Sequence, residues 1–280
     1  MITPSTHALP LADGSLELVV SALSDRGRVR AVNEDSYLAS PPVFLVADGM
    51  GGHRFGDRAS SATARAFAER IDADRPTTVA AVIAAMAESH RRVVELAGDE
   101  QAGTTLSGIA VVQEPGDDQA RWMAFNIGDS RLYSFAASSG LTQISVDHSA
   151  VQELIDLGEI SRAEAETHPE RNVITRALGS GPLPDPDVWL FPIEPDQLFL
   201  ICSDGLTKEL GDDQIAAVVA ADADPAAVAR ELVGAALQAG ASDNVTVVVV
   251  SARRAELRSS LDTDAIPAHL ETTLPREDRR

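Results

Sequence analysis

The order of the expected elements predicts an α+β fold built on antiparallel sheets, with one domain over residues 15–253. Strand candidates follow one another through tight turns, such as the turn at residues 116–118. Helix candidates come in groups instead of alternating with strands, which argues against a parallel sheet. No linker and no internal repeat divides the body of the chain.

The first half of the domain contains the longest helical patterns. Residues 1–14 lack a core pattern, so we expect a flexible N-terminal arm there. We expect an alanine-rich helix at residues 59–70 and strands at residues 16–23, 37–40, 42–47, 103–112 and 122–127. A second helix is expected at residues 78–97, where apolar residues recur at helical spacing: Val79, Val82, Ile83, Met86, Val93, Val94 and Ala97.

The second half of the domain contains clear helix-start signals. Ser161 and Glu164 have the spacing of a capping box. Asp224-Pro225 is typical of an N-cap and the first helical residue, and Gly240 ends that helix. Other helices are expected at residues 149–157 and 212–220, and strands at residues 131–135, 141–144 and 245–251. Residues 254–280 are charged and lack a core pattern, so we expect a disordered C-terminal tail.

The composition narrows the class of protein. Of the 280 residues, 44% are hydrophobic and only 4% aromatic, so the core must be built from Ala, Val, Leu and Ile. The single cysteine, Cys202, excludes an intrachain disulfide. No apolar run is long enough for a membrane span, and no secretory signal precedes the domain, so we expect a cytoplasmic monomer. The net charge of −20 argues against binding to nucleic acid.

Lys208 is the only lysine in the chain. A P-loop ATPase needs a lysine in its glycine-rich loop, and a protein kinase needs one on a strand in a Val-Ala-Ile-Lys context. Neither lysine exists here, so the glycine-rich segment at residues 49–52 is not a nucleotide-binding loop of either kind.

Four aspartates lie where hydrophobic strands end or begin: Asp48, Asp129, Asp204 and Asp243. Burying carboxylates at strand ends is costly unless a cation satisfies them. Hard oxygen ligands, with flanking glycines that let backbone carbonyls take part, suit Mg²⁺ or Mn²⁺. One Asp-Gly pair after a strand is most simply a turn, but four such sites in one chain favour a metal centre.

Carboxylates from distant strands could converge around two metal ions about 3.5–4 Å apart. Such a pair binds a water, lowers its pKa to near neutrality, and clamps a phosphoryl group for in-line attack. A phosphoryl substrate also favours an arginine, because a guanidinium group matches phosphate oxygens in bidentate fashion. Arg30 lies in a loop that also carries Glu34 and Asp35, although alone it would be interpreted as a surface arginine.

Short motifs follow one another over about residues 24–251. They are Ser24-Asp25-Arg26-Gly27, Arg30 to Ser36, Ala47-Asp48-Gly49-Met50-Gly51-Gly52-His53, Gly103-Thr104-Thr105-Leu106, Ile127-Gly128-Asp129-Ser130-Arg131, Thr175-Arg176-Ala177-Leu178-Gly179, Cys202-Ser203-Asp204-Gly205-Leu206 and Asp243-Asn244-Val245-Thr246. This ordered set resembles the bacterial form of the PP2C family (also called PPM) of metal-dependent protein serine/threonine phosphatases.

The resemblance implies a four-layer α-β-β-α sandwich with two antiparallel sheets. It implies hydrolysis of phosphoserine and phosphothreonine on proteins by a water activated between two Mn²⁺ or Mg²⁺ ions. The partners it implies are phosphoproteins and a cognate serine/threonine kinase. The stretch from Ser145 to Arg176 matches the family region that includes a mobile flap beside the site.

The resemblance also implies roles for individual residues. Asp48 would bridge both metals, Gly49 would offer its carbonyl to the second metal, and Asp204 and Asp243 would hold the first. Glu34 would act through metal-bound water, and Arg30 would bind the substrate phosphate. Asp129, with Asp204, would hold a third, labile ion.

One position departs from the animal members of the family. They carry a histidine directly after the bridging Asp-Gly, proposed to protonate the leaving group, whereas this chain has Met50. A thioether cannot donate a proton. The proton must therefore come from a metal-bound water or from another side chain; His53 is near in sequence.

A few residues could indicate other functions. Cys202 could indicate a cysteine phosphatase, but Lys208 stands where that chemistry needs an arginine, so a buried strand cysteine is the better interpretation. The Asp-Ala-Asp segments at residues 72–74 and 222–224 do not follow hydrophobic strands and are interpreted as turns and caps. His148 is interpreted as a loop residue, not a ligand. A catalytically dead binding module would require eroded metal ligands.

Overall fold

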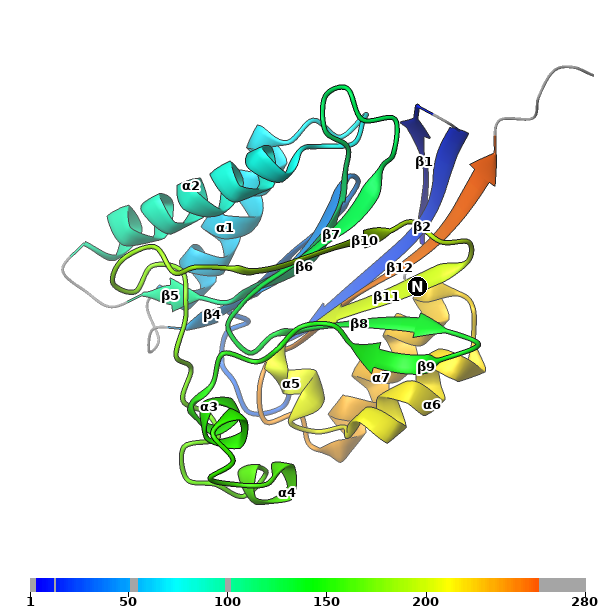
Figure 1. Ribbon diagram of the computed structural model, residues 1–280. Coiled ribbons are helices and arrows are strands. Elements are labelled where there is room, and N and C mark those ends of the chain that lie inside the picture. Colours follow the sequence, from blue (N-terminus) through cyan, green and yellow to red (C-terminus); the bar gives the residue numbers. More distant parts are fainter. Residues whose placement is uncertain (1–3, 13, 51–54, 99–101, 257–280) are drawn as a thin grey trace, which may run out of the picture.

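Two antiparallel sheets lie face to face, and helices cover their outer faces (Figure 1). The computed structural model describes residues 4–12, 14–50, 55–98 and 102–256. The first sheet has the order β1-β2-β12-β11-β8-β9: β1 (Ser5–Leu11), β2 (Gly14–Asp25), β12 (Val245–Glu256), β11 (Gln197–Cys202), β8 (Arg131–Ala136) and β9 (Gly140–Gln143). The second has the order β10-β7-β6-β4-β3: β10 (Asp187–Pro192), β7 (Arg121–Ile127), β6 (Leu106–Val112), β4 (Val43–Met50) and β3 (Asp35–Ser40), and β5 (Gly103–Thr104) pairs with β4.

Each sheet is buried on both faces. Helices α1 (Gly56–Arg70) and α2 (Val79–Ala97) pack on the second sheet through residues such as Phe67 and Val82. Helices α6 (Asp212–Ala221) and α7 (Pro225–Ala239) pack on the first sheet. A further apolar cluster, which includes Trp122 and Phe199, fills the space between the sheets. The predicted α-β-β-α sandwich is confirmed.

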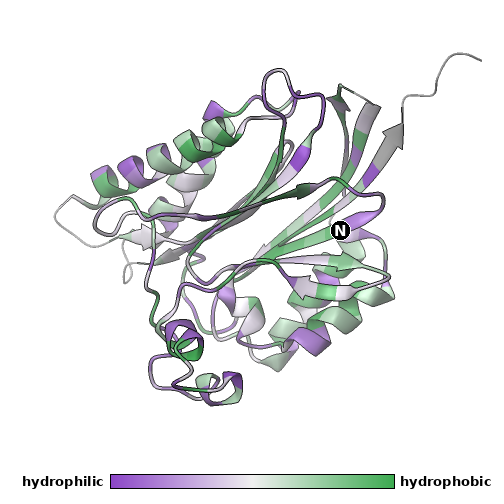
Figure 2. Ribbon diagram, in the orientation of Figure 1, coloured by the Kyte–Doolittle hydropathy of each residue, from purple (hydrophilic) through white to green (hydrophobic). Residues whose placement is uncertain are grey.

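Strand β12 shows why several strands are continuous apolar runs in the sequence. Val248 and Val250 face the core between the sheets, whereas Val247 and Val249 face the core beneath α6 and α7. Successive side chains of a strand point to opposite faces, so a strand covered on both sides gains from an apolar residue at every position. Burying one such side chain contributes about 1.5–3 kcal/mol. The strands in the middle of the layers are correspondingly hydrophobic, and polar residues colour the exposed sides of the helices (Figure 2).

The helix-start signals at Ser161 and Asp224 are confirmed, and Thr78 is a further cap that was not predicted. The Thr78 hydroxyl accepts a hydrogen bond from the Ala81 N–H at the start of α2. Ser161 and Glu164 form a complete capping box at the start of α4 (Arg162–Ala165). Asp224 caps α7, and Pro225 occupies its first turn. None of the described helices has the length and apolar character needed to span a bilayer.

The expected flexible arm at residues 1–14 is wrong for residues 5–11, which form β1. This strand pairs with β2 in a register that puts Leu9 opposite Leu16, and both side chains lie in the core between the sheets. The segment gains backbone hydrogen bonds along the edge of the sheet while burying few side chains, which is why its apolar pattern is weak.

Three other boundaries differ from the prediction. Strand β12 continues to Glu256, so residues 254–256 belong to the sheet and not to the tail. Residues 257–280 lie outside the described residues, as do Gly51, Gly52 and His53 of the glycine-rich motif. Strand β10 was not predicted, because its residues alternate between half-buried and exposed at the sheet edge. The four-residue helix α5 (Asp204–Thr207) was not predicted either.

Helices α3 (Ala150–Asp156) and α4 project beyond one end of the sandwich (Figure 1). Only Ala165 is buried in these two helices. Ser149 bridges to Ile174, which pairs the two ends of the segment with each other, and Leu178, just after the segment, bridges to Thr104 of β5. This projecting segment corresponds to the predicted flap region, and it emerges next to the strand ends that carry the aspartates.

The buried position of Leu9 gives a test of the N-terminal strand. Leu9→Ala should destabilise the protein by about 2–4 kcal/mol, as expected for a leucine truncated in a core, because its side chain is only 1% exposed. Leu11→Ala, on the same strand but only partly buried, should cost less than half as much. Thermal unfolding of both variants measures this difference. Equal melting temperatures for wild type and Leu9→Ala would show that β1 contributes nothing to the core.

Candidate active site

Both sheets contribute acidic residues to one end of the sandwich. Asp35 opens β3 and lies directly opposite Asp48 in the β3–β4 pairing. On the first sheet, β11 leads through Ser203 into Asp204, and Asp243 comes just before β12. The Ser203 N–H donates to the Thr246 carbonyl, which keeps the end of β11 beside the start of β12. The topology therefore gathers carboxylates that are far apart in the sequence.

Two side chains fasten the sheets together at this end. The Ser203 hydroxyl donates to the Asp35 carboxylate at 2.8 Å, and it accepts from the Thr246 N–H at 3.0 Å. Asn244 accepts from the Glu34 N–H at 2.8 Å and donates to the carbonyls of Arg26 and Val32. Ser203 thus positions Asp35, and Asn244 fixes the loop that carries Arg30 and Glu34.

The glycine after two of the aspartates is required by close backbone approach. A Cβ on Gly205 would lie 1.9 Å from the Asn244 carbonyl oxygen. A Cβ on Gly49 would lie 2.1 Å from the Gly56 carbonyl oxygen and 2.6 Å from the Glu34 carbonyl oxygen. Each of these glycines therefore lets two backbone segments pack closely. The contact at Gly205 brings Asp204 near Asp243, and the contact at Gly49 brings Asp48 near Glu34.

Burial raises the pKa of three of the carboxyl groups at this end of the sandwich. Desolvation, followed by the neighbouring carboxylates, raises the pKa of Asp48 well above its ordinary value. Desolvation is also the largest cause for Asp35 and Asp129, and it raises the pKa of each to about 7. Asp243 differs: burial acts to raise its pKa, but Lys208, the Asn244 N–H and Arg30 together hold that pKa below its ordinary value.

Three of these aspartates have an unsatisfied oxygen. Within the described part of the chain, one buried carboxylate oxygen of each of Asp35, Asp129 and Asp204 has no hydrogen-bond partner. A buried carboxylate without a partner costs stability, so these atoms call for a ligand. Carboxylates and the Gly49 carbonyl are the hard oxygen donors that Mg²⁺ and Mn²⁺ prefer. The residues present therefore fit a divalent metal centre.

Two cationic side chains share one oxygen of Asp243. Lys208 Nζ lies 2.5 Å from Asp204 Oδ2 and 3.0 Å from Asp243 Oδ2, and Arg30 Nη2 lies 2.8 Å from Asp243 Oδ2. As they stand, no three His, Cys, Asp or Glu side chains of the described residues enclose a position for a metal ion. Asp204 and Asp243 are instead bridged by the Lys208 ammonium group, and Asp243 is also paired with Arg30.

Asp129 is placed by a buried histidine. The Gly128 N–H donates to His148 Nδ1 at 3.1 Å, and the His148 N–H donates to the Gly128 carbonyl at 3.0 Å. Because Nδ1 accepts, the neutral ring carries its proton on Nε2, which lies 3.2 Å from Asp187 Oδ2. His148 therefore lies in a loop, as predicted, and it is a buried residue that holds the Asp129 turn.

The profile of a family described as "Protein phosphatase 2C" matches residues 27–238. The chain belongs to the protein phosphatase 2C family. It is 38% identical over 245 residues to the serine/threonine protein phosphatase PstP of Mycobacterium tuberculosis, a match covering 85% of this chain and 46% of PstP. The chain thus spans about half the length of that curated relative.

Shorter relatives match over nearly their whole length. The serine/threonine phosphatase stp of Listeria monocytogenes is 33% identical, covering 81% of this chain and 93% of stp. Among solved structures, the catalytic domain of PstP in complex with two manganese ions has a TM-score of 0.75 at 36% identity, covering 85% of this chain and 99% of that one. The resemblance inferred from the motifs is confirmed at the level of the family and of the fold.

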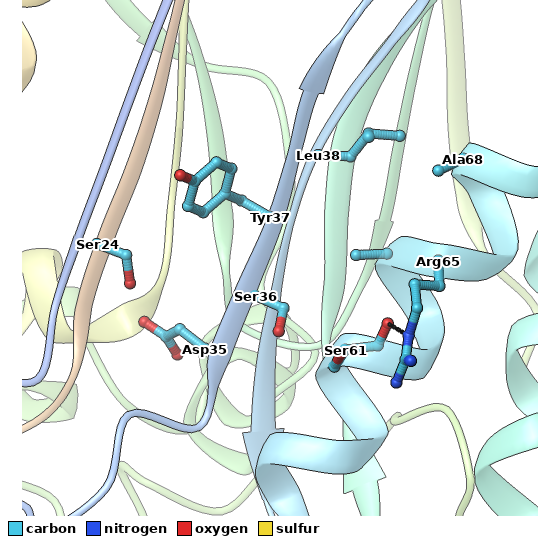
Figure 3. A pocket seen from close by; sticks show the side chains of 9 residues that line it. Ser24, Asp35, Ser36, Tyr37, Leu38, Ser61, Arg65 and Ala68 are labelled. Carbon is cyan, nitrogen blue, oxygen red and sulfur yellow. Dashed lines mark hydrogen bonds between the residues drawn. The ribbon is translucent and has the colours of Figure 1, made fainter. Parts of the chain in front are cut away.

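The groove nearest to this protein phosphatase 2C site runs along the edge strand β3 (Figure 3). It has a volume of about 450 Å³ and is bounded by β3, by α1 and by Ser24 of β2. Asp35 is its one acidic lining residue, and its carboxylate points toward Ser24 (Figure 3). Asp35 is therefore the one residue of the acidic cluster that lines this groove.

The residues set aside as non-catalytic behave as interpreted. Cys202 is fully buried in β11, and burial raises the pKa of its thiol to about 12, so it carries no thiolate at neutral pH. Asp72 accepts the Asp74 N–H, and Asp222 accepts the Asp224 N–H, as turn residues do. Met50 ends β4, and its thioether offers no proton.

Sequence reasoning did not assign roles to Asp35 and Lys208. Asp35 follows Glu34 directly, and only the strand register shows that it faces Asp48 across the sheet. Lys208 lies four residues after Asp204, the spacing at which helical side chains meet, but α5 itself was not predicted. If that short helix had been predicted, the spacing would have indicated the contact between Lys208 and Asp204.

The raised pKa values predict how the metal-free protein responds to pH. The folded state binds more protons than the unfolded state between about pH 4 and about pH 7, because the pKa of Asp35 and of Asp129 is raised to about 7. Stability in excess chelator should therefore fall as the pH rises through this window, by about 1.4 kcal/mol per unit of pKa difference for each group. Melting temperatures measured in chelator from about pH 5 to about pH 8 test this sign.

Asp129→Asn removes one of the buried carboxyl groups whose pKa is raised, and it should therefore flatten the decline. Asp72→Asn, a matched change at an exposed turn, should leave the decline as in wild type. Equal slopes for wild type and Asp129→Asn would contradict the raised pKa of Asp129.

Proposed function

We propose that this protein hydrolyses phosphoserine and phosphothreonine esters on proteins with the help of two divalent metal ions. The observation that carries the proposal is the set of buried carboxylates with unsatisfied oxygens where the two sheets meet, beside an arginine. The PstP catalytic domain, which is similar in sequence and fold, is described as a complex with two manganese ions. When bound, such a pair lowers the pKa of a coordinated water and neutralises phosphoryl charge.

The residues that would hold the metals are those at the strand ends. Asp48 would contact both ions, and the Gly49 carbonyl would contact the second. Asp204 and Asp243 would hold the first ion, and Glu34 would act through water. Asp35, a residue absent from the sequence prediction, would accept hydrogen bonds from the same waters through its unsatisfied oxygen. Metal binding would release the protons that burial keeps on Asp48 and Asp35.

Arg30 would bind the substrate phosphate. Its guanidinium is held at the acidic cluster by Asp243, and 46% of its side chain is exposed. A phosphate arriving from solvent can therefore reach its free N–H groups, and a planar guanidinium matches two phosphate oxygens at once. Arg30 orients the phosphoryl group in this proposal, and it takes no part in generating the nucleophile.

Asp129 would share a third, more weakly held ion with Asp204. Its buried carboxylate has an unsatisfied oxygen, and the charge of Asp204 contributes to its raised pKa. Two like charges in a buried site repel each other unless a cation lies near them. Fewer protein ligands would hold this ion than hold the first two, so it would exchange readily.

The substrate implies a partner enzyme. A phosphoester on serine or threonine must first be made, so a protein serine/threonine kinase has to act on the same proteins. Because such a kinase uses ATP, we place both reactions in the cytoplasm. The net charge of −20 makes nucleic acid an unfavourable partner.

The proposed activity can be tested directly. The purified protein should release phosphate from a phosphothreonine peptide in Mn²⁺, and excess chelator should abolish the reaction. Asp48→Asn and Asp243→Asn should lower kcat by at least about a hundredfold, because each removes a proposed metal ligand. Asp72→Asn, a matched change in a turn remote from the acidic cluster, should retain wild-type turnover.

Full activity in excess chelator would refute the two-metal proposal. The alternative of a binding module that has lost catalysis predicts no release of phosphate under any metal condition, with phosphopeptide binding unaffected by Asp48→Asn.

Arg30 predicts a different kinetic signature. Arg30→Ala should raise KM for phosphopeptides by about tenfold or more with a smaller change in kcat, because it removes a contact to the phosphate without removing a metal ligand. Arg26→Ala, on the same loop but with its guanidinium on the Ala31 carbonyl, is the control. An unchanged KM in Arg30→Ala for every substrate would show that Arg30 is a surface residue.

A further inference from the structure

The only lysine of the 280-residue chain lies inside the acidic cluster. Lys208 follows Asp204 by one turn of α5, and its ammonium group bridges Asp204 Oδ2 and Asp243 Oδ2 at 2.5 and 3.0 Å. These are the two carboxylates that the proposed function assigns to the first metal. One protein cation therefore lies on the same pair of oxygens that a divalent ion would need.

This ammonium group is permanently charged and is compensated by its neighbours. Burial acts to lower the pKa of Lys208, but Asp204 and Asp243 outweigh it and hold that pKa above its ordinary value. The same ammonium acts to lower the pKa of Asp129 and Asp243. Without it, the cluster would hold unpaired buried carboxylates, which is strongly destabilising.

We propose that Lys208 is a built-in counter-ion, which stabilises the metal-free protein and which the first divalent ion must displace from Asp204 and Asp243. The inference rests on the proposed metal site. If so, the affinity of the site for the metal ion depends on displacing the Lys208 ammonium group as well as on the carboxylates.

The geometry permits this exchange without unfolding. The Lys208 side chain is 32% exposed, and its four-carbon stem lets the ammonium move toward solvent while the backbone stays in place. Arg30 shares the Asp243 oxygen but is more exposed, so it can turn to a phosphate at the same time. The Lys208 ammonium group then leaves the two carboxylates when the metal arrives, and Arg30 is available to the phosphate.

The exchange predicts a weakened apparent affinity. A ligand that binds only the open form of a site has its affinity reduced by the fraction of molecules in that form. If the bridged arrangement is favoured about tenfold or more, removing the ammonium should tighten metal binding by about the same factor. The metal-free protein should lose stability at the same time, because Asp204 and Asp243 lose their counter-ion.

Because the chain has a single lysine, the Lys208 side chain can be observed by NMR in the wild-type protein. Full-length protein labelled with ¹³C and ¹⁵N in lysine, without added lysines in a tag, gives one lysine side-chain signal in solution NMR. Titration of the chelator-treated protein with Mg²⁺ should shift this signal with the midpoint that calorimetry measures for Mg²⁺ binding. A signal that stays in place while calorimetry records binding would overturn the inference and leave the metal site intact. Absence of any Mg²⁺ or Mn²⁺ binding would overturn both.

Two variants complete the test. Lys208→Met should bind Mn²⁺ about tenfold or more tightly than Arg26→Gln, a control that also removes one positive charge from this end of the molecule. Lys208→Met should melt at a lower temperature than wild type in chelator, and the deficit should close in saturating Mn²⁺.

A purely structural role for the lysine stem would lower the melting temperature equally in chelator and in Mn²⁺, and that result would refute the proposal. So would a Mn²⁺ affinity equal to that of Arg26→Gln. If Lys208→Met fails to fold, the wild-type NMR titration decides alone.

Discussion

The burial of several carboxylates where the two sheets meet is the constraint on which the rest of this structure depends. Each is costly to desolvate, and together they repel one another. The protein offsets this with raised pKa values at Asp48 and Asp35, which favour their neutral forms, with the Ser203 hydroxyl, and with the cationic groups of Lys208 and Arg30. Because Asp35 comes from one sheet and its donor Ser203 from the other, the acidic cluster also fastens the two sheets at this end.

The same constraint explains the sequence around each aspartate. Only glycine fits at positions 205 and 49, because a Cβ there would overlap a neighbouring backbone carbonyl. Asn244 follows Asp243 because its amide joins three separate backbone groups of the loop at residues 26–34. Each motif therefore combines an acidic residue with a neighbour that allows or makes a close backbone contact. This is why each motif is short and why the set is specific.

Much of the fold could be predicted from the sequence because its signals are local. Caps at Thr78, Ser161 and Asp224 and the apolar run of β12 depend only on near neighbours in the chain. Strands β1 and β10 were missed because an edge strand is stabilised by the strand beside it, and its own side chains are mostly exposed or half-buried. The aspartates at strand ends were likewise visible, whereas Asp35 and Lys208 depend on strand register and on a four-residue helix.

The free-energy cost of burying these carboxylates is an argument that the site binds a cation. In the metal-free protein, desolvation and then the neighbouring carboxylates raise the pKa of Asp48, and three buried carboxylate oxygens have no partner in the described part of the chain. A module that needed only the fold would be stabilised by replacing such groups with apolar residues of similar size. A costly arrangement of this kind is expected where a site must bind a cation strongly enough to displace protons and a lysine. The unfavourable electrostatics of the metal-free cluster and its proposed affinity for divalent ions are thus two consequences of the same carboxylates.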